Sequence, residues 1–193
     1  MINQHINFLI MDISISNKKY KVIYADPPWY FKSYSQKGQG RNATKHYQCL
    51  GLSDIVSLPV ERIAEDNSTL LMWVTDPFLK KAFEVIEGWG FTYKTVAFTW
   101  VKMNKTNPDY FTGMGYWTRA NPEMCLLATK GKPKRINKDV QQLVVSKRRE
   151  HSRKPDEMYN RIERLVEGPY IELFARTKRP GWDSWGNQTD KFK

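Results

Sequence analysis

The chain has 193 residues, of which 40% are hydrophobic and 13% aromatic, so it can form a single domain over residues 1–193 and is too apolar for wholesale disorder. Its formal net charge of +11 favours a polyanionic partner over a merely soluble basic protein. No apolar run is long enough to span a membrane, and two cysteines are too few for a disulfide framework. We therefore expect a soluble protein of the cytoplasm that does not bind a membrane.

Short runs rich in β-branched and aromatic residues predict six strands. The first, residues 21–25, ends abruptly at Asp26 because Pro27 and Pro28 cannot donate to a strand ladder. The other five are residues 69–74, 95–101, 123–129, 143–146 and 170–174.

Segments with helical periodicity lie between these strands. Two apolar stripes predict helices around residues 78–86 and 158–166. A third, weaker helix over residues 54–64 is expected to break at Pro59. This alternation predicts an α/β fold with a mostly parallel sheet, helices on both faces and ligands at the carboxyl ends of the strands.

Two long connections, residues 31–49 and 103–122, interrupt this rhythm. Connections of this length in a compact domain are usually functional lids or disordered. The second contains several aromatic rings, Tyr116 and Trp117 among them, which argues against simple disorder. We expect both to be active-site or substrate loops, and residues 1–19 to form an N-terminal extension.

The tetrapeptide Asp26-Pro27-Pro28-Trp29 carries the most specific chemistry in the chain. The exocyclic amine of adenine is a poor nucleophile because its lone pair is delocalised into the ring. Acceptors on its two N–H bonds, the Asp26 carboxylate and the Pro27 carbonyl, would free that lone pair, and the prolines would hold the carbonyl in place. Trp29 and Tyr30 offer rings on which a flipped base could stack. The alternative is a strand-ending turn with Trp29 packed beneath it.

Basic residues are concentrated between positions 130 and 154. Such a run is often only a solvated face. Together with an aromatic loop and a base-modifying motif, phosphate binding accounts better for the group. Its ten cations are Lys130, Lys132, Lys134, Arg135, Lys138, Lys147, Arg148, Arg149, Arg153 and Lys154.

Metal ligands are not predicted. His46 and Cys49 have ligand-like spacing, but no second pair of ligands follows them. Cys125 stands outside any Cys-x-x-Cys pair, so neither zinc nor redox chemistry is expected.

Several blocks in a fixed order give the chain a resemblance to the adenine-N6 methyltransferases of the mRNA-adenosine-methyltransferase (MT-A70) type. The resemblance covers about residues 20–188. The blocks are the tetrapeptide at 26–29, GRNATKHY at 40–47, LMWV at 71–74, WVK at 100–102, EMCL at 123–126, HSRKPD at 151–156, IELFAR at 171–176 and WGNQ at 185–188.

The resemblance implies a Rossmann-like methyltransferase sheet in the permuted, β-class motif order, with S-adenosylmethionine as cofactor and residues 170–174 as the cofactor-binding strand. It places Glu172 beside the cofactor, and Asn187 and Gln188 near the ribose and adenine. The chemistry of these residue types agrees, because a carboxylate at the end of a parallel strand can accept from ribose hydroxyls. The resemblance places Lys102 toward the cofactor carboxylate or the target nucleotide. The full cofactor set is Asp26, Lys102, Glu172, Phe174, Arg176, Asn187 and Gln188. The substrate set is Tyr30, Arg41, His46, Tyr47, Tyr116, Trp117, Lys147, Arg148 and Arg149.

The predicted function is S-adenosylmethionine-dependent methylation of N6 of adenine in nucleic acid. DNA is favoured over RNA because the compact chain resembles the small bacterial and bacteriophage members of the family. The alternatives are an RNA adenosine methyltransferase, a catalytically silent nucleic-acid-binding subunit and a plain basic RNA-binding module. A degraded tetrapeptide would mark the silent subunit, and here the tetrapeptide is intact. A monomer, a homodimer and a complex with a partner subunit all stay open.

Overall fold

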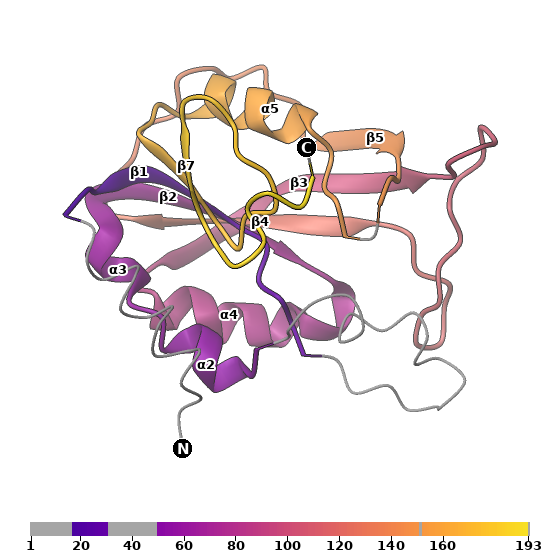
Figure 1. Cartoon of the computed structure of the whole chain (residues 1–193), viewed down its shortest axis with the longest axis horizontal. Coiled ribbons are helices and arrows are strands. Elements are labelled where there is room, and N and C mark those ends of the chain that lie inside the picture. Colours follow the sequence, from indigo (N-terminus) through magenta and orange to yellow (C-terminus); the bar gives the residue numbers. More distant parts are fainter. Residues whose placement is uncertain (1–16, 31–49, 151, 193) are drawn as a thin grey trace.

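The computed structural model describes residues 17–30, 50–150 and 152–192. Seven strands form one sheet in the order β5-β3-β4-β2-β1-β6-β7 (Figure 1). Their bounds are β1 Tyr20–Ala25, β2 Ala64–Val74, β3 Thr92–Met103, β4 Glu123–Lys130, β5 Leu143–Lys147, β6 Tyr170–Leu173 and β7 Trp182–Trp185.

The sheet is parallel except at β4. Parallel pairs join β1 to β2 and β6, β6 to β7, and β3 to β5, whereas β4 runs antiparallel to both β2 and β3. All strands other than β4 in the described sheet therefore point the same way. We call the edge where they end the carboxyl edge and the opposite one the amino edge. Asp26 follows β1 at the carboxyl edge, where Glu123 begins β4.

Helices cover both faces of this sheet (Figure 1). One face carries α2 (Leu52–Val56), α3 (Val60–Ile63), the 3-10 turn η3 (Asp76–Phe78) and α4 (Leu79–Gly88), and the other carries α5 (Glu157–Leu165). Alternate strand residues feed two separate cores. On β1, Ile23 packs in the core of α2 to α4, while Tyr24 packs in the core of α5. The predicted α/β class is confirmed, because a sheet covered on both faces has this alternation.

The strand β7 was not predicted from the sequence. Its two central residues, Asp183 and Ser184, are polar, and Gly181 and Gly186 bound it, so the local pattern resembles a connection. Parallel pairing with β6 makes it a strand. This segment is therefore a strand because of a tertiary contact, which the local sequence does not reveal.

The predicted helix over residues 54–64 is correct in part. It breaks at Pro59 into α2 and α3, as expected, but Ala64 already begins β2. The other predicted strands and helices are found near their expected positions. No helix in the described ranges is both long and apolar enough to cross a membrane.

Candidate active site

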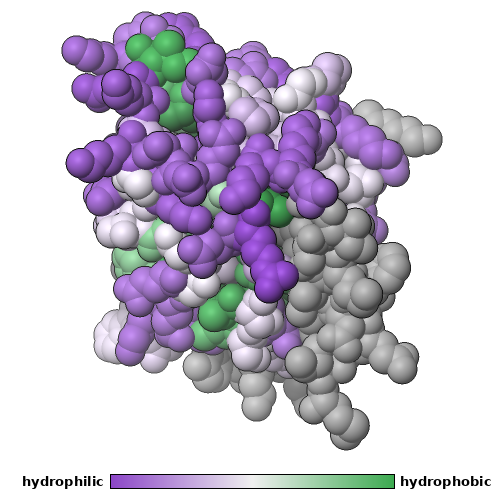
Figure 2. All heavy atoms as spheres, turned by 90° about the vertical axis from the view of Figure 1, so that its left-hand side faces the viewer, coloured by the Kyte–Doolittle hydropathy of each residue, from purple (hydrophilic) through white to green (hydrophobic). Residues whose placement is uncertain are grey.

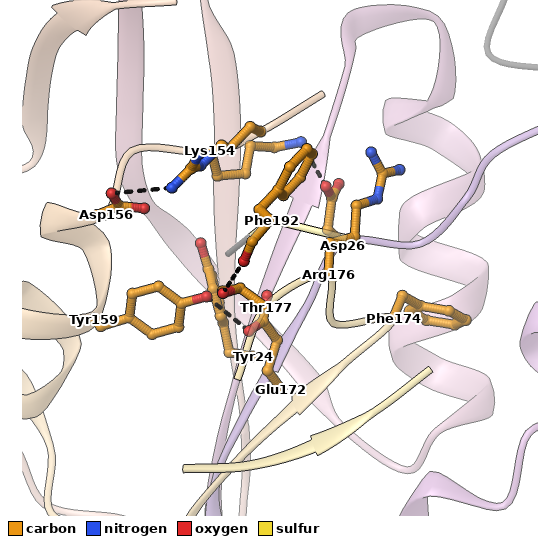
Figure 3. Close-up of a pocket in the computed structure, with 11 residues that line it drawn as sticks. Tyr24, Asp26, Lys154, Asp156, Tyr159, Glu172, Phe174, Arg176, Thr177 and Phe192 are labelled. Carbon is orange, nitrogen blue, oxygen red and sulfur yellow. Dashed lines mark hydrogen bonds and ion pairs between the residues drawn. The ribbon is translucent and has the colours of Figure 1, made fainter. Parts of the chain in front are cut away.

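An open pocket lies at the carboxyl edge, between β1, β6, α5 and the chain that follows β6 (Figure 3). Asp26 enters it from the end of β1, Lys154 from the segment before α5, and Glu172 from β6. Phe174 and Arg176 line it from the segment after β6. The sheet thus brings together side chains from opposite ends of the sequence.

A chain of alternating charges runs from the pocket wall to side chains of β4 and β3. Lys154 Nζ lies 2.7 Å from Asp26 Oδ2 and 3.2 Å from Glu123 Oε2. The other oxygen of Glu123 lies 2.6 Å from Lys102 Nζ. The four side chains are only 12–19% exposed. Two anions and two cations therefore balance one another where little water can screen them.

This arrangement controls the ionisation of Glu123. Burial alone favours its neutral form, but the charges of Lys154 and Lys102, with their hydrogen bonds, outweigh burial and lower the pKa of Glu123 to about 2. Glu123 is thus a fixed anion that holds Lys154 against Asp26. The Asp26 carboxylate is oriented by an ammonium that is itself anchored.

Glu172 differs from Glu123 because its pKa is raised and not lowered. Burial raises its pKa to about 7, against the effect of the Tyr159 hydroxyl, which donates to Glu172 Oε2 at 2.7 Å. The negative charge of Asp26 adds to the rise. No hydrogen bond among the described residues uses Oε1 of Glu172. Unlike the ion-paired Asp26 and Asp156, which also line the pocket, Glu172 therefore changes protonation near neutral pH.

The structure brings four members of the expected cofactor set together and separates three. Asp26, Glu172, Phe174 and Arg176 all line the pocket. Lys102 lies outside its lining and contacts Glu123 instead. Residues 187–188 follow β7 at the same edge, outside the pocket lining, and Gln188 Oε1 accepts from Lys191 Nζ.

The active-site position of Lys154 is not predicted from the sequence. There, Lys154 is grouped with the phosphate-binding cations, and the position near the cofactor or target nucleotide is assigned to Lys102. The structure instead puts Lys154 on Asp26 and Lys102 one carboxylate further away. A sequence signal did exist, since Lys154 stands in the block HSRKPD on which the resemblance partly rests.

The rest of the tetrapeptide is tightly packed. Trp29 is 8% exposed and stacks on Phe78 with ring centroids 5.5 Å apart. The Pro27 carbonyl accepts from the Trp29 amide, and the Pro28 carbonyl accepts from the amide of Leu50. In this conformation Trp29 has the packing role that the alternative interpretation gave it, with one face covered by Phe78. Tyr30, 54% exposed, presents the more accessible ring.

The basic segment does not form one surface. Lys130 is the last residue of β4, at the amino edge. At the same edge the Lys132 amide donates to the Asn67 side chain. The Ile136 amide donates to the carbonyl of Leu165, the last residue of α5. Figure 2 looks at that edge, where hydrophilic residues cover most of the visible face. By contrast, Lys147 ends β5 at the carboxyl edge, and residues 148–150 and 152–154 come after it. Only this second group lies at the same edge as Asp26.

The expected substrate residues at the carboxyl edge differ in their contacts and in their exposure to solvent. Arg149 forms two hydrogen bonds to Asp156, which raise its pKa. The Arg148 guanidinium stacks on Phe111 at 3.8 Å, and Lys147 is exposed. Tyr116 and Trp117 lie at the exposed tip of the 103–122 connection.

Part of the expected site lies outside the described residues. Arg41, His46 and Tyr47 belong to this part, as does Cys49. Within the ranges that the structure describes, no group of three or more His, Cys, Asp or Glu side chains could hold a metal ion. Cys125 is a buried free thiol whose pKa burial raises far above its ordinary value.

Comparison of the sequence with known proteins shows the family to which the chain belongs. A model of the MT-A70 family matches residues 20–188. The type II methyltransferase M.MunI of a Mycoplasma species is 37% identical over 190 residues, which cover 89% of this chain and 78% of that protein. Human METTL3, an N(6)-adenosine-methyltransferase catalytic subunit, is 32% identical over 185 residues, covering 93% of this chain and 30% of that protein. A Medicago truncatula protein, described as a putative MT-A70-like N(6)-adenosine-methyltransferase, is 35% identical over 176 residues, covering 88% and 26% respectively.

The chain therefore belongs to the MT-A70 family and is a methyltransferase, which confirms the resemblance carried by its ordered blocks. It spans most of the length of M.MunI but less than a third of the two eukaryotic relatives.

The charge chain makes Lys154 a testable residue. Lys154→Met keeps the length of the side chain but leaves Asp26 and Glu123 without their shared cation. We expect a loss of about 2–4 kcal/mol in the free energy of unfolding at pH 7, because breaking a buried pair leaves uncompensated charge. The exposed Lys147→Met is the matched control and should change stability by less than about 0.5 kcal/mol.

The pH dependence separates this electrostatic effect from simple loss of packing. In the native chain Glu123 has a lowered pKa, so its contribution to stability is present above its unfolded pKa of about 4.3 and is lost as the pH falls toward about 2. Without Lys154 the pKa of Glu123 is lowered less and this carboxylate protonates more readily, so the deficit of Lys154→Met should shrink between pH 7 and pH 4 in urea titrations. An equal deficit at both pH values would contradict the account.

Proposed function

We propose that this protein transfers a methyl group from S-adenosylmethionine to the exocyclic N6 amine of adenine in DNA. The observation that carries the proposal is the meeting of Asp26, Glu172, Phe174 and Arg176 in one pocket at the carboxyl edge. This edge is where open α/β sheets bind their ligands. The proposed place of action is the cytoplasm of a bacterium or of a bacteriophage-infected cell, and the similarity to M.MunI of a Mycoplasma species supports it.

The pocket residues fit the proposed cofactor. Glu172 has an oxygen, Oε1, that could accept from ribose hydroxyls. Asp26 supplies negative charge for the ammonium or sulfonium of the cofactor, and Phe174 supplies an apolar wall. A cationic ligand beside Asp26 would favour the ionised form of Glu172, which is its better acceptor form. When bound, S-adenosylmethionine would supply a methyl group on a cationic sulfur.

Asp26 is the residue we assign to catalysis. Its Oδ2 faces Lys154, and no hydrogen bond among the described residues uses Oδ1, which is thus the atom available to the adenine amine. The Pro27 carbonyl accepts one backbone bond and retains a second lone pair for the other N–H. Asp26 would stabilise the positive charge that develops on the nitrogen, and the proton would leave afterwards to Asp26 or to water.

The preference for DNA over RNA is supported by the relative M.MunI, a type II methyltransferase that is 37% identical to the chain, compared with 35% and 32% for the two relatives described as N(6)-adenosine-methyltransferases. The small bacterial and bacteriophage members that it resembles act on DNA. RNA of the same sequence is the matched competitor in any assay, and a monomer, a homodimer and a complex with a partner subunit are all compatible with the proposal.

The first functional prediction concerns Asp26→Ala. Removing the acceptor and its charge should lower the single-turnover rate of methyl transfer at least about a hundredfold at saturating cofactor and DNA. Asp66→Ala, an exposed carboxylate on β2 near the amino edge, is the control and should keep the native rate. A folded Asp26→Ala protein with a near-native rate would mean that the tetrapeptide is only a structural turn.

The second functional prediction uses the division of the basic segment between two edges. Lys147→Ala should weaken binding to DNA of any sequence and reduce the slope of log affinity against log salt by about 0.7–0.9. Lys132→Ala removes an equally exposed lysine at the amino edge and should leave the slope unchanged. Equal effects of the two substitutions, in binding titrations from low to moderate salt, would place the DNA elsewhere.

A further inference from the structure

The connection between β3 and β4, residues 103–122, is a folded projection that we call the finger. Its two arms are joined by a hydrogen bond from the Gly113 amide to the Ala120 carbonyl at 2.8 Å. At its base, the Asn121 side chain bonds to backbone atoms of Lys102 and Phe111. Figure 1 shows the finger extending past the carboxyl edge, at the right of the view.

The tip of the finger displays large apolar side chains to solvent. Trp117 is 95% exposed and Tyr116 83%. The Thr118 amide donates to the Tyr116 carbonyl across Trp117, whose φ is 71°. Such a γ-turn is strained, and a bulky residue rarely adopts this conformation. The turn is also built closely, because a Cβ on Gly115 would lie 2.1 Å from the Thr118 carbonyl oxygen.

The exposure of Tyr116 and Trp117 indicates that the fingertip binds a ligand. A tryptophan that packs on nothing contributes no burial energy, and strained backbone of this sort concentrates at functional sites. The chemistry assigned to Asp26 involves no residue of the fingertip.

The surroundings of the finger indicate a polyanionic ligand. Arg148, at the end of β5, stacks on Phe111 at 3.8 Å and donates its amide to the Met103 carbonyl at the base of the finger. Lys147 beside it and Arg119 near the tip are exposed. An apolar tip on a cationic base matches nucleic acid, where phosphates surround stacked bases, better than the apolar face of another protein.

The position of Asp26 determines which adenine bases can reach it. The Asp26 side chain is 19% exposed and lies inside the pocket. An adenine stacked in a duplex cannot reach such a site unless it turns out of the helix, which costs unstacking energy. Apolar side chains that enter a base step can meet part of that cost. The finger and the pocket occupy the same edge of the sheet.

We propose that the finger is a wedge for double-stranded DNA, in which Trp117 stacks in the space left by the adenine that turns toward Asp26. This inference rests on the proposed function for the identity of the base and extends it by naming duplex DNA as the substrate form. The wedge itself can be tested without methyl transfer.

Binding to a duplex that carries one abasic site provides this test. Native protein should bind it about tenfold more tightly than the intact duplex of the same sequence, measured by fluorescence anisotropy, because the gap accepts a ring at no unstacking cost. Trp117→Ala should lose this preference and Trp117→Phe should keep most of it. Ile136→Ala, an exposed apolar residue of the segment anchored at the amino edge, is the control and should keep all of it.

Three results of these measurements would overturn the wedge. The first is equal binding of both duplexes by the native protein, and the second is a preference that survives in Trp117→Ala. The third is a Trp117→Ala protein whose mass in light scattering falls from dimer to monomer, which would make the fingertip a subunit interface.

Methyl transfer then separates the wedge from the proposed function. On native plasmid DNA, Trp117→Ala should transfer methyl groups at least about tenfold more slowly than the native protein. On the same DNA after heat denaturation the two should be equal. An equal loss on both forms would contradict the wedge. A native protein inactive on both forms would defeat the proposed function, while the abasic comparison would still decide the wedge.

Discussion

The ion pair between Asp26 and Lys154 is the contact on which the site depends. It joins residues 128 positions apart in the sequence at 2.7 Å, and it exists because β1 and the segment before α5 reach the same edge of one sheet. Glu123 completes it from β4, the strand that runs against the others. Without the second carboxylate, Lys154 would be held less firmly, and Asp26 would in turn be oriented less firmly. A catalytic acceptor is useful only when its geometry is set before the substrate arrives.

The same pocket gives two carboxyl groups different tasks through their surroundings alone. Asp26 has an ammonium beside it, whereas Glu172 has burial and the charge of Asp26, and its pKa rises to about 7. Such a difference in the surroundings of two neighbouring carboxyl groups is typical of sites that give the two groups different roles. The cofactor role proposed for Glu172 and the catalytic role proposed for Asp26 follow from that difference.

Local patterns predicted the alternating strands and helices, β6 among them, and the tetrapeptide at the end of β1, because each has a strong signature in neighbouring residues. The cofactor role of β6 is implied by the family resemblance and not by its local pattern. Features set by distant contacts were missed. The strand β7 is a strand through its pairing with β6, and Lys154 differs from nearby cations only in the carboxylates that it meets. The basic segment is one run in the sequence, yet β4 and β5 carry its halves to opposite edges. Trp29 could not be assigned to the core before Phe78 was known to stack on it.

The most direct test of the central claim is to identify the methylated atom. Native protein would be incubated with methyl-labelled S-adenosylmethionine and unmethylated duplex DNA, with RNA of the same sequence alongside, and the nucleosides separated by mass spectrometry after digestion. The account predicts that the label is found in N6-methyldeoxyadenosine, with far less in the RNA sample. Label on cytosine, label in RNA alone, or none in either nucleic acid with a folded protein would contradict it.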